Sequence, residues 1–167
     1  MNRSEAFRCQ AESDLSVFQL LVSQDGMATC HWLHYLQMTS EKIGRAVRLA
    51  DEQSGADALS HAAIVKALRL LRNQRGAARA LGRDSRQFQQ LVDRCLPIAY
   101  EIERLAPSFA AGPNPEYPWH DPMKPASWIA PSCHQFSIAA TMRGPDGQRY
   151  LRLLRELIAR LDEVFVN

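Results

Sequence analysis

Residues 28–53 read ATCHWLHYLQMTSEKIGRAVRLADEQ, and the spacing of their apolar residues decides the fold class. Apolar side chains recur at intervals of three, four and seven residues, which places them on one face of an α-helix while the charged residues fall elsewhere. The stretch therefore predicts a long amphipathic helix at the centre of the fold. Its apolar positions are Trp32, Leu36, Ile43, Val47 and Ala50.

Two shorter helices are predicted, one before and one after this central helix. Residues 14–24 form an apolar run with a polar start, and the run stops at the Asp25-Gly26 turn. After the central helix, Ser60 is a suitable N-cap for a helix that extends to about Asn73. Both segments have the length of ordinary bundle helices.

The second half of the chain adds two long helices. Residues 85–105 follow Asp84, which offers an N-cap with Gln87 as its N3 partner. Pro97 lies inside this helix and removes one backbone donor, but apolar residues persist on both sides of it, which favours a kink over a break. A final amphipathic helix follows a GPDG turn at residues 144–147. We therefore predict an all-α fold, a bundle of about five helices.

Residues 107–131 differ in composition from the rest of the chain. This segment, PSFAAGPNPEYPWHDPMKPASWIAP, holds seven of the nine prolines and two of the three tryptophans. The prolines exclude a continuous helix or a central strand. A disordered linker rarely carries so many large aromatic side chains. We predict an ordered excursion before the last helix, held against the helical body by buried aromatic residues.

The whole chain, residues 1–167, is predicted to form a single helical domain. Within it we expect a flexible N-terminus (1–13), a helical core (14–106), the Pro/aromatic-rich excursion (107–131), and a C-terminal segment with the last helix (132–167). With 46% hydrophobic and 23% charged residues, the composition is that of a folded globular protein.

Cysteine usage and hydropathy indicate the compartment. The four cysteines lie far apart without a CxxC pair, which is typical of reduced thiols. No stretch approaches the roughly 18 continuous apolar residues that span a bilayer, and the N-terminus has no apolar run behind its positive charge. We expect a cytoplasmic protein with no membrane partner and no cofactor.

Residues 66–86, KALRLLRNQRGAARALGRDSR, carry seven basic side chains and one acid in a chain of formal net charge +2. On one unbroken helix, five of these arginines would share a face and could follow a phosphate backbone. Gly76 and Gly82 argue against one helix, and no aromatic residue in the stretch could stack on bases. A solvated face, a protein-partner surface and a nucleic-acid site stay open. The arginines of the nucleic-acid alternative are Arg72, Arg75, Arg79, Arg83 and Arg86.

The histidines offer another place for chemistry. His31 and His34 would lie one turn apart on a helix, a spacing that lets two imidazoles reach one ion. His120-Asp121 or Cys133-His134 could supply further ligands if the excursion folds over that helix. Because no HExxH or paired CxxC is present, we predict no metal site and keep His31 and His34 as the alternative. No GxSxG, P-loop or dinucleotide motif supports an ordinary enzyme class.

Two stretches resemble known families. Residues 28–72 resemble the start of HEPN-type helical bundles. This region reads CHWLHYLQMTSEKIGRAVRL, then SHAAIVKALRLL, and a longer helix follows it. The resemblance consists of a Tyr/His-rich helix, an E-K-x-x-[KR]-A pattern and an S-H pair. HEPN ribonucleases carry an Arg four to six residues from a His, and no histidine here has an Arg before it at that spacing. The resemblance therefore implies a non-catalytic, often dimeric, antitoxin, scaffold or assembly partner. Residues 96–119 are similar to a family of small bacterial hypothetical proteins, which implies no function.

The sequence favours a non-catalytic binding or assembly protein, an accessory or antitoxin-like component of a bacterial stress or defence system. Its partner would be another protein or a second copy. The predicted partner-binding residues are Tyr117, Trp119 and His120, because aromatic side chains on a proline frame lose little entropy on docking, although Trp119 also suits a core position. The alternative is a HEPN-type or other RNA-binding or RNA-cleaving protein that uses the Arg-rich surface with His31, His34 or His61.

Overall fold

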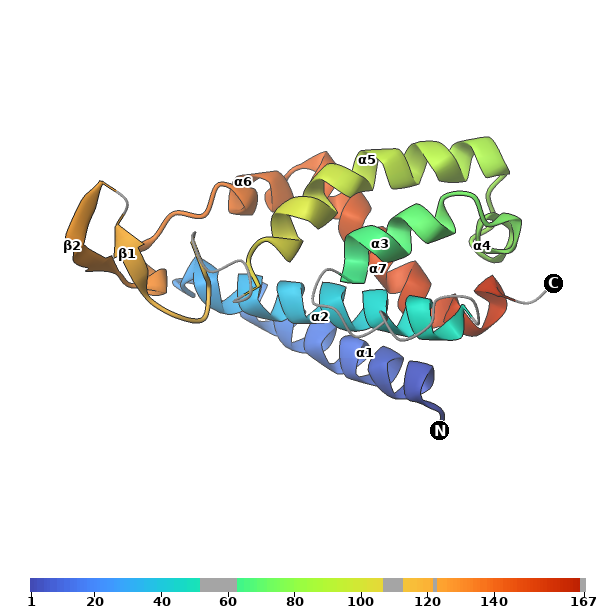
Figure 1. Cartoon of the computed structure of the whole chain (residues 1–167), viewed down its shortest axis with the longest axis horizontal. Coiled ribbons are helices and arrows are strands. Elements are labelled where there is room, and N and C mark those ends of the chain that lie inside the picture. The colour runs from blue at the N-terminus through green and yellow to red at the C-terminus, as the bar shows by residue number, and fades with distance from the viewer. Residues whose placement is uncertain (52–62, 107–112, 122, 166–167) are drawn as a thin grey trace.

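The computed structural model describes residues 1–51, 63–106, 113–121 and 123–165. Over these residues the chain is an elongated bundle of α-helices with a small β-hairpin at one end, and α1 begins at the opposite end (Figure 1). Seven α-helices lie in the described part, and two of them, α4 and α6, have six residues each. The predicted all-α fold is confirmed.

Helix α1 (Arg3–Val22) begins at the very start of the chain, which differs from the flexible segment predicted over residues 1–13. The Asn2 side chain accepts a hydrogen bond from the Glu5 amide at 2.9 Å, and the Asn2 amide donates to the Glu5 carboxylate at 3.3 Å. This capping box satisfies amides that would otherwise lack partners at the helix start. Because Ala11 is buried and Phe7 packs against the core, the early turns also have tertiary support.

Helix α2 (Thr29–Ala50) is the central helix that the sequence predicted. It runs beside α1 and also contacts α3, α5 and α7 (Figure 1). Its apolar face is fully covered, with Leu33, Leu36 and Ile43 among the largest buried side chains. Helical spacing alone therefore identified the helix and most of the face that it buries, although Ala50 is only half-buried and the charged Arg48 is buried.

The Arg-rich stretch is divided among three helices, as its glycines predicted. They are α3 (Ala63–Leu71), α4 (Arg75–Ala80) and α5 (Ser85–Glu103). Gly82 has φ +66°, a left-handed conformation that ends the short helix at little steric cost. The Asp84 side chain then accepts from the Gln87 amide at 2.8 Å and caps α5 as predicted. Ser60, the predicted cap of the preceding helix, lies outside the described residues.

Helices α2, α3 and α5 meet at one close contact. A Cβ at Gly44 of α2 would lie 2.6 Å from backbone atoms of Ala63 and Ile64, so glycine is required for α3 to approach. From α5, the buried Glu103 carboxylate accepts the Val65 amide at 3.3 Å and so caps the start of α3. Helix α5 continues through Pro97 without a break, which agrees with the apolar residues on both sides of it.

The excursion contains strands β1 (Trp119–Asp121) and β2 (Lys124–Ile129), which pair antiparallel as a peripheral two-stranded sheet. A 3₁₀-helix η3 (Pro131–Cys133) and the short α6 (Ile138–Arg143) return the chain to the bundle. Helix α7 (Pro145–Val164) then packs against α1, α2, α4, α5 and α6. The described part of the excursion is thus ordered, and its prolines leave room only for short strands at the edge.

The GPDG motif is the first turn of α7, whereas the sequence predicted a turn before the helix. Gly144 is the N-cap and Pro145 the first helical residue, a position that tolerates proline because its amide needs no partner there. A Cβ at Gly147 would collide with Met142, so this glycine lets α6 and α7 pack closely across a tight connection.

A buried polar contact joins α7 to the central helix. The Tyr150 side chain is fully buried, and its hydroxyl donates to Ser40 Oγ at 2.8 Å. Ser40 in turn donates to the Leu36 carbonyl at 2.8 Å, so the buried hydroxyls are satisfied.

Among the helices of the described ranges, none combines the length and the apolar character that a membrane span requires.

Candidate partner-binding hairpin

The hairpin β1–β2 has an inward and an outward face. Trp119 is paired with Ile129, and His120 with Trp128, in the antiparallel register. Because neighbouring residues of a strand point to opposite faces, the two pairs lie on different sides of the sheet. Trp119 and Ile129 are half-buried, while His120 and Trp128 are exposed. The hairpin therefore presents the Trp119–Ile129 pair to the protein and the aromatic His120–Trp128 pair to solvent.

The inward face fixes the hairpin to the bundle. The Trp119 ring contacts His134 edge-on with ring centroids 5.0 Å apart, and His134 contacts Phe136 in the same way at 4.7 Å. Phe136 is buried and belongs to the main core, which Trp119 also contacts. Edge-to-face geometry is a favourable arrangement for aromatic rings. Trp119 is thus an anchor of the hairpin.

The outward face is an exposed aromatic surface. The rings of His120 and Trp128 contact each other at an interplanar angle of 37° with centroids 3.8 Å apart, and Trp128 is still 64% exposed. Met123 in the connection between the strands is 86% exposed, and Tyr117 just before β1 is 55% exposed. We call these four residues the outer hairpin face. Three large apolar side chains exposed within one hairpin and the segment just before it are typical of an interaction site.

Local hydrogen bonds hold the ends of the hairpin in shape. The Asn114 side chain accepts from the amides of Glu116 and Tyr117 at 2.7 and 3.1 Å, and the Asp121 side chain accepts from the Met123 amide at 2.8 Å. Such side-chain turns fix the backbone on both sides of a strand. The pKa of the Tyr117 hydroxyl is raised because it hydrogen-bonds to the negatively charged Glu116. Tyr117 therefore stays neutral at physiological pH.

The predicted binding residues fall in two places. Tyr117 and His120 are exposed, whereas Trp119 is half-buried and packs against the core. Sequence reasoning did not select Trp128 and Met123, which are the most exposed large apolar residues of the hairpin. Trp119 and Trp128 lie on different strands, so their opposite exposure follows from the pairing register of the hairpin and not from the alternation within one strand.

The histidines of α2 line a groove between the helix and the excursion. Its volume is about 510 Å³, and its walls include His31, His34, Glu116 and Ser132. The nearest charged contact joins His34 Nδ1 and Glu116 Oε2 at 4.0 Å. Among the residues that the structure describes, no group of three or more His, Cys, Asp or Glu side chains could hold a metal ion. The structure thus does not assemble the ligand set considered for His31 and His34, and His61 lies outside the described residues.

The groove also contains Cys30, whose chemistry is restrained by its surroundings. The Cys30 side chain is buried, and burial raises the pKa of its thiol. A protonated thiol is a poor nucleophile. Cys30 is therefore not an activated cysteine. The imidazole of His34 and the carboxylate of Glu116 are too far apart for a hydrogen bond.

The five arginines of the nucleic-acid alternative are used differently from one another. Arg72 makes a bidentate contact with Asp93 of α5 at 2.7 and 2.9 Å. Arg83 donates to the Leu81 carbonyl at 2.8 Å and contacts both carboxylate oxygens of Glu156 on α7 at 2.9 and 3.0 Å. Arg75, Arg79 and Arg86 are exposed. Two of the five guanidinium groups are thus already neutralised by neighbouring helices.

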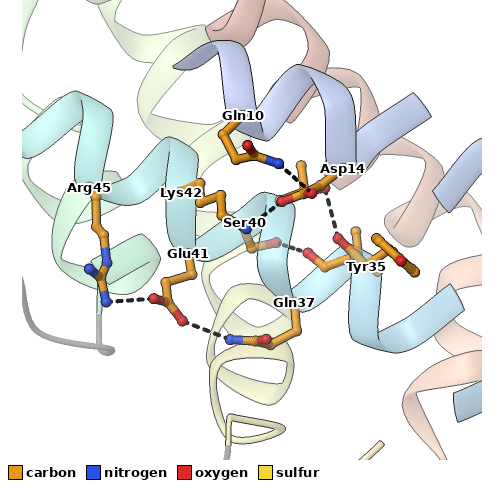
Figure 2. Close-up of polar contacts among 10 residues, drawn as sticks. Gln10, Asp14, Tyr35, Gln37, Ser40, Glu41, Lys42 and Arg45 are labelled. Carbon is orange, nitrogen blue, oxygen red and sulfur yellow. Dashed lines mark hydrogen bonds and ion pairs between the residues drawn. The ribbon is translucent and has the colours of Figure 1, made fainter. Parts of the chain in front are cut away.

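A polar seam lies between α1 and α2 (Figure 2). Lys42 Nζ donates to Asp14 Oδ2 at 2.6 Å, and Gln10 donates to the other oxygen of that carboxylate at 3.1 Å. Glu41 accepts from Gln37 at 3.0 Å and pairs with Arg45 at 2.6 Å. The Asp14 and Lys42 side chains are largely buried, so each group is stabilised by the other. The Asp14–Lys42 pair therefore joins the two helices, whereas Gln37, Glu41 and Arg45 contact one another along α2.

Comparisons of this chain with protein-family models, with curated proteins and with solved structures give no match. The resemblance of residues 28–72 to HEPN bundles therefore stays a prediction.

Proposed function

We propose that this protein is a non-catalytic binding protein whose outer hairpin face docks into an apolar cleft on a different protein. The observation that carries the proposal is the exposure of Trp128 on a hairpin that is itself fixed to the bundle through Trp119. Tryptophan is the residue most enriched among the side chains that dominate binding energy at interfaces.

The shape of the hairpin favours a concave partner. It projects from one end of the bundle (Figure 1), and its exposed aromatics are accompanied by Glu116, Asp121 and Lys124, which carry charges of both signs. A convex surface buries large area against a cleft, whereas two convex hairpins of the same chain would cover little of each other. The mixed charges suit a polar rim around an apolar centre.

The support beneath the hairpin reduces the cost of binding. The contact of the Trp128 ring with His120 restricts the side chain, and the turns at Asn114 and Asp121 restrict the backbone, before a partner arrives. Preorganised groups lose less entropy on docking. By the HEPN resemblance, the proposed role is that of an accessory or antitoxin-like component in the cytoplasm, where its thiols would stay reduced.

The test uses Trp128 as a site-specific probe. With a photoreactive benzoyl-phenylalanine at position 128, the full chain is irradiated in the cell of origin and the crosslinked protein is identified. The purified partner is then titrated with the unmodified chain and with Trp128→Ala. We expect the dissociation constant to increase by about 30-fold or more, which is the loss typical of a central interface tryptophan.

Leu20→Ala is the matched control, because Leu20 is an apolar residue of α1 that is 58% exposed and lies outside the hairpin. It should bind the partner as the unmodified chain does, and circular dichroism should show all variants folded. If Trp128→Ala binds with unchanged affinity, the proposal is refuted. A self-associated species in sedimentation analysis that Trp128→Ala abolishes would also refute it, in favour of a second copy as the occupant.

A further inference from the structure

A pocket of about 450 Å³ opens on the side of the bundle, and it shares no residue with the outer hairpin face. It is bounded by the C-terminal end of α1, the turn at residues 23–27, the start of α2 and the connection between α6 and α7. At about 30 Å³ for each water molecule, this volume corresponds to roughly 15 non-hydrogen atoms. It falls within the range of small-molecule sites.

The deep part of the pocket is apolar. Its walls include Phe18, Trp32, Met142 and Leu151, each of which is buried in the fold. Phe18 and Trp32 meet edge to face with ring centroids 6.0 Å apart, which joins α1 to α2 and holds both rings in place. An occupant therefore needs an apolar body.

The wall formed by α6 and α7 is rigid. Gly147 permits the close approach of Met142, and the exposed Gln148 side chain donates from Nε2 to the Met142 carbonyl at 3.1 Å. These contacts set the position of Met142 on one side of the pocket and of Leu151 one turn further along α7. The pocket is thus largely formed before any ligand enters.

The rim of the pocket carries a positive excess. Arg143 and Arg155 line it together with a single carboxylate, Asp25. Within the described ranges, neither arginine makes a hydrogen bond or an ion pair. Arg143 lies in the last turn of α6, where the helix dipole favours a cation, but this does not account for Arg155 in the middle of α7. Both side chains are exposed, and guanidinium groups at the rim of an apolar cavity suit the carboxylate of an amphipathic molecule.

We infer that this pocket binds a small amphipathic carboxylate, with its alkyl or aryl body against Phe18, Trp32 and Met142 and its carboxylate at Arg143 and Arg155. The site is independent of the outer hairpin face. Its ligand class is set by the combination of an apolar floor and a cationic rim, a combination that favours a medium-chain fatty acid or an aromatic acid over a neutral or cationic molecule.

Isothermal titration of the full chain with decanoate tests this inference, with decanol and decyltrimethylammonium as ligands of the same chain length and different charge. We expect saturable decanoate binding at one site and at least about tenfold weaker binding of the other two, because a charge-assisted hydrogen bond is lost. Arg143→Gln and Arg155→Gln should each weaken decanoate binding by about tenfold.

Arg152→Gln is the matched control, since Arg152 is an exposed arginine of α7 that does not line the pocket. It should leave the affinity unchanged, and so should Trp128→Ala, which separates this test from that of the proposed function. The inference is overturned if decanoate does not bind, if decanol binds equally well, or if Arg152→Gln weakens binding as much as the two rim variants do.

Discussion

The core of the helical bundle and the outer hairpin face place their large side chains in opposite ways. In the bundle, Tyr150 is fully buried with its hydroxyl bonded, and the buried carboxylates of Asp14 and Glu103 have donors beside them. In the hairpin, Trp128 and Met123 face solvent. Folding explains the buried side chains of the bundle, because their burial removes apolar surface from water. The exposed side chains of the hairpin add little to folding, and they are the ones that we propose to contact a partner.

The largest expected loss of stability comes from breaking the buried ion pair between Asp14 and Lys42. Lys42→Met leaves the Asp14 carboxylate without its cation in the seam between α1 and α2, and should lower the free energy of unfolding by about 3 kcal/mol, as measured in urea. The double variant Asp14→Leu, Lys42→Met removes both charges and should recover most of the loss. Equal destabilisation in the single and double variants would show that the charge is not the cause.

A smaller loss is expected where α2 and α3 touch. Gly44→Ala introduces a Cβ 2.6 Å from the backbone of α3, and the helices must separate, at a cost of about 2 kcal/mol. Gly144→Ala is the control, because a Cβ there has its nearest neighbour at 3.4 Å and φ is −85°. Its free energy of unfolding should change by less than about 1 kcal/mol. If both variants are equally stable, the close contact is relaxed in solution.

The buried carboxylate of α5 should make stability depend on pH. Burial raises the pKa of Glu103 above its ordinary value near 4.5. The folded protein therefore keeps a proton that the unfolded chain releases, and the free energy of unfolding falls as pH rises from 4.5 through the folded pKa. Glu103→Gln should lack this fall, measured by urea unfolding at several pH values. Glu101→Gln, on the exposed side of α5, should keep it.

The smallest effect on global stability is expected in the hairpin. Trp119→Ala removes the ring that packs on His134 but leaves the bundle core intact, so the free energy of unfolding should fall by less than about 1 kcal/mol. Hydrogen exchange of the β1–β2 amides should nevertheless become at least about tenfold faster, because the hairpin loses its attachment. Trp128→Ala should leave the free energy of unfolding unchanged and should speed exchange less than Trp119→Ala does, because Trp119 still attaches the hairpin. If the β1–β2 amides exchange no faster in Trp119→Ala than in the unmodified chain, other contacts hold the hairpin.

Most of the helical body could be predicted from local pattern. The intervals of three, four and seven in α2 identify its buried face, Gly82 marks the end of α4, and Asp84 marks the start of α5. The start of α1 was missed although Asn2 and Glu5 form a capping box, because the apolar spacing over the first turns is sparse. The capping box is a local signal, but at the start of α1 no run of helically spaced apolar residues accompanies it.

The candidate sites depended on distant contacts. That Trp119 anchors the hairpin and Trp128 is exposed follows from a strand register and from His134 and Phe136, which come later in the chain. The pocket at Arg143 and Arg155 exists because α1, α2, α6 and α7 meet. Local sequence specifies the helices, their caps and their buried faces, since these depend on neighbours within a few residues. Which aromatics and arginines remain available to a partner depends on tertiary packing, since burial is set by what lies against each side chain.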